Sequence, residues 1–591
     1  MLRSRVSRLR RVGGPSISPK GVSTMRRVLS PRTPSRPRHR VTLGLERLED
    51  RTVPSTFTVT NLHDSGAGSL RAAVGAAGDG HTIKFAGGLH GTIPLTSGQL
   101  SVSHSVTIDG PGANKLSVSG NHASRIFDVS GSASVRISGL TITDGVAPIG
   151  GGILLEGSAA LNLSNCTLSD NEAIGTADPN IQANGGLGGG IEDTSSGTLT
   201  VSSCALVGNK AIGVGPNNPS TPADGDVLSL GGGIDVAFSA TGSSTISNSI
   251  FIGNQALGGS AGASSGGGAI SNSSFTATMT VSNCTLSDNV AIGAAGGDGI
   301  VNFGSGQGGG INNFGILNVA NSTLCDNLAL GTPLAPGAVP SQDLSNGSAT
   351  GGGGILCLTG PTPASVTVTN STLTGNRAIG GAGASGSAGS VGLGGGISLV
   401  AATGLISNCR IDGNVAQGGA GGAGGIGAPG AGGGIDLVFS TATVSNTRIV
   451  GNKAIGGAGG AGAAGGDGVG GGIDDGTGVL LGIGDDSSLT LTNCKLSANQ
   501  AIGGAGGSGS NGGDGLGGGL SVRAGSASVS NSKITANRAQ GGAAGAGGSH
   551  GHGVGGGVYV GVDDNDLGTF TYVHTKIKRN HASTSNDDIF P

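Results

Sequence analysis

Two short stretches near the C-terminus gather the side chains best suited to acid–base chemistry. Charged residues make up only 11% of the 591-residue chain, yet residues 473–499 and 558–580 contain seven aspartates. They are Asp474, Asp475, Asp485, Asp486, Asp563, Asp564 and Asp566. Paired carboxyls can act as the acid and the base, or the acid and the nucleophile, of glycoside hydrolysis. His552 lies between the two stretches, in a Gly551-His552-Gly553 tripeptide.

An internal repeat sets the elements that must position these residues. A glycine triplet and an aliphatic residue recur eleven times, with Ala269 inserted once, and an Asn-Xaa-Ala tripeptide follows each copy. Self-similarity at a period of 36 to 47 residues predicts an array of stacked units. The aliphatic residues are Ile153, Ile191, Ile234, Ile270, Ile311, Ile355, Ile397, Ile435, Ile473, Leu520 and Val558. The asparagines are Asn171, Asn209, Asn254, Asn289, Asn327, Asn376, Asn414, Asn452, Asn499, Asn537 and Asn580.

Each unit fits one turn of a parallel β-helix. The segment Gly394–Gln417 contains two or three short stretches of alternating apolar residues, separated by Gly, Ser, Asn and Asp. This pattern predicts strands and turns, and no window has the 3.6-residue spacing of a helix. The unit is too short for a propeller blade and lacks the leucine pattern of a leucine-rich repeat. We therefore predict an all-β solenoid in which equivalent strands lie about 4.8 Å apart.

Two columns of small polar residues are expected along the stack. The amide of each Asn-Xaa-Ala can donate to and accept from its copies in adjacent turns, so these asparagines should form a ladder. Five cysteines follow an earlier polar column, and we expect small buried thiols rather than disulfides or a zinc site. That earlier column contains Asn165, Ser203, Asn248, Asn283, Asn321, Asn370, Asn408, Asn446, Asn493, Asn531 and His574.

Five glycine-rich inserts of seventeen residues each interrupt the C-terminal repeats. A flexible linker has no reason to keep its length, so we predict loops stacked on one flank, with room only for hydrogen or methyl side chains. Recent duplication without divergence is the alternative. Asp467 and Asp514 do not stand where a calcium-binding nonapeptide places its aspartate, so we expect no cofactor, with occasional surface calcium as the alternative. The inserts are Gly380–Gly396, Gly418–Gly434, Gly456–Gly472, Gly503–Gly519 and Gly541–Gly557.

Charge divides the chain into a basic N-terminal arm and an acidic remainder. Residues 1–51 contain fourteen Lys and Arg against three acids, although the whole chain has a net charge of −3. We predict a basic disordered arm or export tag over 1–54, a cap with the first turns over 55–149, and the eleven repeats over 150–591. An acidic array would repel phosphate, so we expect no nucleic-acid partner. No stretch has the length and hydropathy of a transmembrane segment.

Three segments resemble known bacterial surface proteins. LERLEDRTVPS at 45–55 resembles the Leu-Glu-x-Leu-Glu-Asp-Arg tag of many such proteins. TFTVTNLHDSGAGSLRAAV at 56–74 is similar to the entry segment of right-handed parallel β-helix proteins of the pectin-lyase-like superfold. The repeats resemble those of polymorphic outer-membrane proteins and adhesin passengers. The resemblance implies a single-stranded right-handed coil and an extracellular or cell-surface location, with Ser69 capping a short helix that closes the base.

The same superfold contains polysaccharide lyases and galacturonan hydrolases. The hydrolases combine clustered carboxylates with Gly-His-Gly and Arg-Ile-Lys. Here Asp563-Asp564 follows Gly551-His552-Gly553 instead of preceding it, and Lys576-Ile577-Lys578 lacks the arginine. No turn displays the several Asp and the base that a lyase needs. Trp, which commonly stacks on sugar rings, is absent.

We therefore expect a non-enzymatic, structural or adhesin-like rod at the cell surface. It would be monomeric, and its flanks would bind cell-envelope or extracellular polysaccharide or protein. The near-regular repeats favour this prediction, because an active site needs an irregular turn. The alternative is a polysaccharide lyase or glycoside hydrolase with Asp485, Asp486, Asp563, Asp564 and His552 as site residues.

Overall fold

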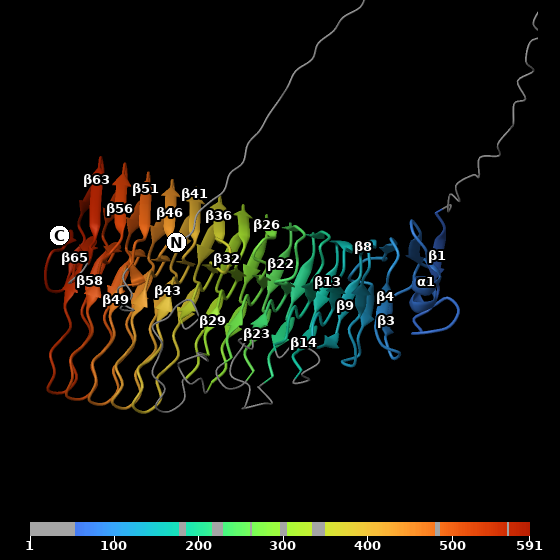
Figure 1. Cartoon of the computed structure of the whole chain (residues 1–591), viewed down its shortest axis with the longest axis horizontal. Helices are drawn as coiled ribbons and strands as arrows, with labels where there is room; N and C mark the ends of the chain where they lie inside the picture. Colours follow the sequence, from blue (N-terminus) through green and yellow to red (C-terminus); the bar gives the residue numbers. More distant parts are fainter. Residues whose placement is uncertain are drawn as a thin grey trace, which may run out of the picture. The chain divides into compact units, whose positions relative to one another are not determined.

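The computed structural model describes residues 54–176, 185–214, 228–259, 263–295, 304–333, 349–478, 485–563 and 566–590. The chain divides into the units Met1–Arg51 and Thr52–Pro591, and every described residue belongs to the second. In that unit, strands stack turn upon turn in sequence order, so the colours run from blue to red along the stack (Figure 1). The architecture is a single-stranded right-handed parallel β-helix, as predicted.

Five parallel sheets, here named A to E, make up the coil. Every strand in them pairs in register with its equivalent in the next turn. Sheet A runs from β1 (Thr56–Val59) to β63 (Thr569–Val573), and sheet B from β3 (Gly91–Pro94) to β64 (Lys576–Lys578). Sheet C runs from β4 (Leu100–Val102) to β66 (Ile589–Phe590), sheet D from β10 (Val146–Ala147) to β65 (His581–Ala582), and sheet E from β19 (Ser229–Leu230) to β59 (Gly553–Val554).

One complete turn contains five strands, in the sheet order C, A, B, D, E. The sequence predicted only two or three per unit. The two- and three-residue strands of sheets D and E are too short to show a period of two, which explains the difference. A representative turn is β40 (Ile397–Val400), β41 (Thr403–Ser407), β42 (Arg410–Asp412), β43 (Val415–Gln417) and β44 (Gly430–Ala431).

Aliphatic side chains fill the interior of the coil as one continuous cluster. All eleven aliphatic residues that follow a glycine triplet begin a strand of sheet C and are fully buried. Each lies on its counterpart from the adjacent turn, as Ile397 does on Ile435. The repeat period therefore identified the core-facing column correctly.

The predicted amide ladder is present and buried. From Asn171 to Asn580, each side-chain Nδ2 donates to the Oδ1 of the next asparagine at 2.8–3.0 Å. At the C-terminal end, Asn580 donates instead to the carboxylate of Asp588 at 2.9 Å. Because every amide proton has an acceptor, these polar side chains can be buried without an unsatisfied donor.

The earlier polar column has a different cause. Its eleven members stand between sheets A and B with φ between +49° and +55°. Asn tolerates this left-handed conformation better than most residues, because its short amide can form local hydrogen bonds. Asn408 and its equivalents are exposed on the surface of the coil. All seven cysteines are free thiols, and six of them are buried.

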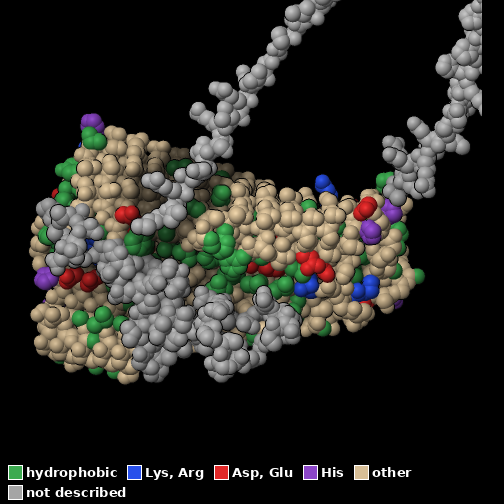
Figure 2. All heavy atoms as spheres, in the orientation of Figure 1, with side chains coloured by type: hydrophobic (Ala, Val, Ile, Leu, Met, Phe, Trp, Pro, Cys, Tyr) green, Lys and Arg blue, Asp and Glu red, His purple; other side chains and the backbone are tan. Residues whose placement is uncertain are grey.

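The five seventeen-residue inserts stack on one another through main-chain hydrogen bonds. Gly383 N donates to Ala420 O at 2.7 Å, and Gly421 N donates to Ala458 O at 2.8 Å in the following pair. A Cβ added at Gly419 would lie 1.9 Å from Gly381 O. The inserts are therefore packed elements, as predicted. Figure 2 shows a face on which the backbone and small polar side chains predominate and charged side chains are few.

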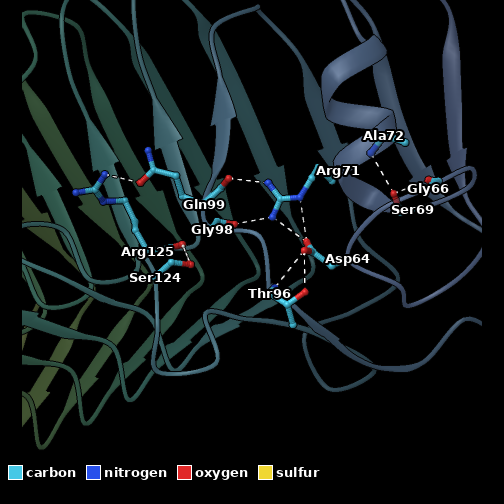
Figure 3. Close-up of polar contacts among 10 residues, drawn as sticks. All are labelled: Asp64, Gly66, Ser69, Arg71, Ala72, Thr96, Gly98, Gln99, Ser124 and Arg125. Carbon is cyan, nitrogen blue, oxygen red and sulfur yellow. Dashed lines mark hydrogen bonds and ion pairs between the residues drawn. The ribbon is translucent and has the colours of Figure 1, made fainter.

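Helix α1 (Leu70–Ala76) lies at the base of the coil, where Leu70 and Ala73 join the interior cluster. Ser69 is its N-cap and accepts a hydrogen bond from Ala72 N at 3.1 Å, as predicted. The guanidinium of Arg71 binds the carboxylate of Asp64 at 2.8 Å and donates to the carbonyls of Gly98 and Gln99 (Figure 3). No helix in the described ranges combines the length and hydropathy needed to cross a membrane.

Candidate functional site

The outer face of sheet C carries a column of polar residues that is covered from solvent. In each strand of this sheet the first and third residues face the interior, and the middle residue points away from it. We name the middle residues of the nine strands from β15 (Ile191–Asp193) to β55 (Leu520–Val522) the outer column. Although they point outward, none is more than 4% exposed. From β15 (Ile191–Asp193) to β55 (Leu520–Val522) they are Glu192, Asp235, Ser271, Asn312, Leu356, Ser398, Asp436, Asp474 and Ser521.

The glycine triplet explains why the column is covered. Its first residue turns the chain sharply from sheet E into sheet C with a positive φ, +60° at Gly432. A Cβ on Gly432 would lie 2.5 Å from the Cβ of Asp436, so only glycine permits this close approach. Sheet E and the outer column then pack together. Between Phe314 and Val469 this contact becomes a second apolar cluster.

Two aspartates of adjacent turns meet in the C-terminal half of the column. Asp436 lies on β45 (Ile435–Val438) and Asp474 lies beside it on β50 (Ile473–Asp475). Thr477 Oγ1 bridges them, 2.5 Å from Asp436 Oδ1 and 2.6 Å from Asp474 Oδ2. Arg523 Nη2 lies 3.6 Å from Asp474 Oδ2. We name Asp436, Asp474, Thr477 and Arg523 the Asp436 cluster.

The bridge requires a proton on one of the two carboxyls. A hydroxyl group has a single proton to donate, so Thr477 can donate to only one of its two carboxyl contacts. The other carboxyl must donate to Thr477. Burial, together with the negative charge of Asp474, raises the pKa of Asp436 well above its usual range. We assign the proton to Asp436, which leaves Asp474 as the partner that faces the Arg523 charge.

Two further aspartates surround the cluster in different roles. Asp475 faces the interior of the coil between Leu437 and Val522, and burial together with the charge of Asp474 raises its pKa to about 8. Asp485 accepts main-chain hydrogen bonds from Phe439, Gly478 and Ser487, at 2.8–3.0 Å. It therefore fixes the chain beside the cluster. Burial raises its pKa, although these hydrogen bonds act in the opposite direction.

A second group of carboxyls lies in the N-terminal half of the column. Glu192 and Asp235 are adjacent there, and Asp193 faces the interior beside them. Burial and the neighbouring Asp235 raise the pKa of Glu192 well above its usual range, and burial raises that of Asp235 to about 7. The guanidinium of Arg125 donates to the carbonyls of Ile149 and Gly150. Through these hydrogen bonds, Arg125 fixes a turn beside the carboxyls.

The residues named from the sequence end up in several places. Asp474, Asp475 and Asp485 are buried together. Asp486 is exposed. His552 is also exposed, with Nδ1 3.5 Å from Asp514 Oδ1 of the preceding insert.

The remaining two candidates lie in the C-terminal ribbon. Asp563 belongs to β61 (Val562–Asp563), which pairs antiparallel with β62 (Asp566–Leu567). Asp564 lies outside the described residues. Sequence reasoning missed Asp436, Thr477 and Arg523, although position two after each glycine triplet could have drawn attention to Asp436.

Within the described residues, no group of three or more His, Cys, Asp or Glu side chains has the arrangement of a metal site. The Asp436 cluster offers paired carboxyls and a guanidinium.

Known proteins match this chain through structure alone. No protein-family model matches it, and no curated protein matches its sequence. Solved structures with similar folds include the A-module of the mannuronan C-5 epimerase AlgE6 from Azotobacter vinelandii, at 8% identity and a TM-score of 0.36 over 88% of this chain and 98% of that one. Pectate lyase Pel9A has 12% identity and a TM-score of 0.26, over 61% of this chain and 77% of that one.

A third similar structure is the catalytic unit of a GH87 α-1,3-glucanase from Streptomyces thermodiastaticus. It has 12% identity and a TM-score of 0.32 over 91% of this chain and 70% of that one. At these values the likeness concerns the fold and transfers no residue, substrate or reaction to this chain.

The prediction of a non-enzymatic rod is wrong. Most of the similar structures are named as enzymes that act on polysaccharides, so they give the rod prediction no support. The array of repeats is also irregular at one place. The turn that contains β50 brings Asp474, Thr477 and Arg523 against Asp436, and the neighbouring turns have no equivalent cluster among the described residues.

Proposed function

We propose that this chain is a polysaccharide-active enzyme whose reacting groups are Asp436 and Asp474. One observation carries the proposal, namely the Thr477 hydroxyl that joins the two carboxyls and requires one of them to be protonated. A protonated carboxyl can act as the general acid at a glycosidic oxygen, and an ionised one can act as nucleophile or base. We assign the first role to Asp436 and the second to Asp474.

Arg523 supports an acidic rather than a neutral substrate. It is 7% exposed, and its Nε and Nη2 have no hydrogen-bond acceptor among the described residues. A guanidinium with free donors suits a sugar carboxylate, which it can bind through two parallel hydrogen bonds. The proposed substrate is therefore a polymer that contains uronic acid.

Substrate access is a requirement of this proposal. Asp436 and Asp474 are both fully buried, so a sugar can reach them only if the side chains that cover them move on binding. Arg523 lies closest to the surface in the cluster, and its displacement would open the way to Asp474. Exclusion of water beforehand would strengthen the electrostatic interaction between the carboxyls and the sugar.

We also propose an extracellular or cell-surface location. Its support is the likeness of residues 45–55 to a surface-protein tag and of the repeats to polymorphic outer-membrane proteins. Fractionation of cells that express the full chain, compared with cells that express a chain lacking residues 45–51, tests this location. We further propose that the chain is a monomer and that it needs no resident cofactor. Turnover with and without calcium, measured in the experiment below, tests the second of these proposals.

The decisive experiment measures turnover of alginate, polygalacturonate and a neutral α-glucan by the full chain, with and without calcium. New reducing ends report hydrolysis, and unsaturated uronate absorbance reports lyase chemistry. We expect product from an acidic polymer, and we expect Asp436→Asn and Asp474→Asn to reduce its rate by about 100-fold or more. Asp486→Asn is the matched control, because Asp486 is an exposed carboxyl of the same turn. Equal activity in all three variants would overturn the site assignment.

A further inference from the structure

A row of cations stands on the outer face of sheet B, in the C-terminal part of the coil. The strands are β42, β47 (Arg448–Val450), β52 (Lys495–Ser497), β57 (Lys533–Thr535) and β64. Each begins with a basic residue, and these residues are register partners from turn to turn. Earlier turns have Thr, Ala or Ile at this position. We name the row the basic ladder, and it consists of Arg410, Arg448, Lys495, Lys533 and Lys576.

The charges of the basic ladder are largely uncompensated. Arg410 binds the carboxylate of Asp412. The other four form no ion pair within the described residues, and Lys495 alone among the five is half-buried. Neighbouring turns lie about 4.8 Å apart, so like charges face one another at close range. The electrostatic repulsion between these cations is reduced when an anion binds along the row.

Amide groups line one side of the ladder. The exposed asparagine column described above stands two residues before each of the first four cations, with Asn446 before Arg448 and Asn493 before Lys495, and His574 takes that place before Lys576. Asn493 Nδ2 donates to Asn446 Oδ1 at 3.3 Å, so these side chains lie along the same direction as the cations. An amide can both donate to and accept from a hydroxyl group. The surface therefore offers a positive charge and a hydroxyl-binding group in every turn.

We propose that the basic ladder and its asparagines bind a linear acidic polysaccharide lying parallel to the coil axis. Sugar carboxylates would bind Arg448, Lys495 and Lys533, and sugar hydroxyls would bind the asparagine column. Sheet B lies apart from the outer column of sheet C, so this binding surface does not depend on the catalytic proposal.

The same surface suits nucleic acid less well. Duplex DNA carries one charge about every 1.7 Å, much closer than one cation per turn. Proteins that bind single strands stack the bases on aromatic side chains. Among the described residues, the large exposed apolar side chains of sheet B are Ile250 and Ile252, which precede the ladder and are not aromatic.

A second set of cations provides a matched control. On sheet D, Arg377, Lys453 and Arg538 also point outward, but Val415 and Gln500 separate them, so a cation occurs only in every second turn. The triple variants R448Q/K495Q/K533Q and R377Q/K453Q/R538Q therefore remove the same charge. The first removes cations from consecutive turns of sheet B, and the second removes them from every second turn of sheet D.

The experiment measures binding of polygalacturonate to the full chain by affinity electrophoresis and calorimetry, at two salt concentrations. We expect the ladder variant to lose affinity about tenfold or more, with a weaker salt dependence, and the sheet D variant to change it less than about threefold. The ladder variant should lose the same factor of affinity in a D436N background, which separates this surface from the catalytic proposal. The melting temperature of each variant confirms that it is folded.

Three results would overturn the proposal. If both triple variants lost the same affinity for polygalacturonate, net charge alone would explain the binding. If the ladder variant kept its affinity, the polymer would bind at another surface. Tighter binding of a single-stranded oligonucleotide than of polygalacturonate, lost in the ladder variant, would assign the surface to nucleic acid instead.

Discussion

The third residue of β50 shows how a single side chain can link the stability of the coil to pH. Neither carboxyl oxygen of Asp475 has a hydrogen-bond partner within the described residues, and aliphatic side chains lie above and below it. Its pKa of about 8 compares with about 4 for a solvated aspartate. Between these values the folded chain keeps a proton that the unfolded chain releases, so stability falls as the pH rises from about 4 to 8.

Replacement of this carboxyl should therefore stabilise the protein under alkaline conditions. Asp475→Leu puts into the column the residue that the preceding turn has as Leu437. We expect its melting temperature to exceed that of the wild type by roughly 2–6 °C at pH 8, and the difference to shrink towards pH 4. Calorimetry at pH 4.5, 6 and 8 measures this, with Asp486→Asn as the exposed control. A difference that did not vary with pH would contradict the assigned titration.

At the scale of elements, the glycine-rich inserts behave as a packed layer. Successive copies approach so closely that main-chain groups take the place of side-chain contacts. Within Gly418–Gly434, a Cβ at Gly419 would collide with Gly381 O of the copy before it. Gly424, in contrast, has open space around it and a φ of +78°. The two positions separate the cost of stacking from the cost of a left-handed backbone.

We expect Gly419→Ala to destabilise the stack far more than Gly424→Ala. The first forces main chains apart, whereas the second carries only the left-handed penalty of about 1–2 kcal/mol. Limited proteolysis and thermal denaturation of both variants provide the measurement. If both variants melted alike, close packing of the inserts would not contribute to stability.

Sequence reasoning reached the elements whose residues repeat. The buried aliphatic column, the asparagine ladder and the Ser69 cap each have a residue type that only one environment favours. The strands of sheets D and E were not predicted from the sequence, because a strand of two or three residues is too short to show a period of two. The Asn-Xaa-Ala tripeptide predicted the asparagine ladder, but it did not predict the sheet D strand that begins at its second residue.

The candidate site was predicted only in part. The doublets Asp474-Asp475 and Asp485-Asp486 stood out as charge in a chain poor in it. Asp436 did not, because the same position is Ser398 one turn earlier and Asn312 three turns earlier, so it looked like one more polar surface residue. The burial of this outward-facing column comes from the packing of sheet E against sheet C, and the two-residue strands of sheet E have no period from which that packing could be predicted.

At the scale of the whole described coil, stability is built from contacts between neighbouring turns, so the ends matter most. Asp64 anchors the base through Arg71 and Thr96. Burial would raise the pKa of Asp64, but the hydrogen bonds and the charge of Arg71 lower it to about 2. This anchoring is complete above about pH 4, where an unfolded aspartate is also ionised, and it is lost as the pH falls towards 2.

Arg71→Ala should therefore loosen the base first. We expect faster amide hydrogen exchange over residues 56–102 at pH 6, without change over residues 397–417. In the wild type, the same acceleration should appear only as the pH falls from about 4 to 2. Arg136→Ala is the control, because Arg136 is an exposed residue of β8 (Ser134–Ser138). Uniform acceleration along the coil would show that the base is not an independent unit.

The asparagine ladder also gives the coil an electrical direction. Every side-chain amide donates toward the C-terminal turn and accepts from the N-terminal one, so their dipoles add along the axis instead of cancelling. The positive ends point to the last turn, where Asp588 receives both the main-chain and the side-chain N–H of Asn580. The Asp588 carboxylate thus stabilises the positive end of a row of aligned side-chain amides, as an acidic side chain does at the N-terminus of a helix.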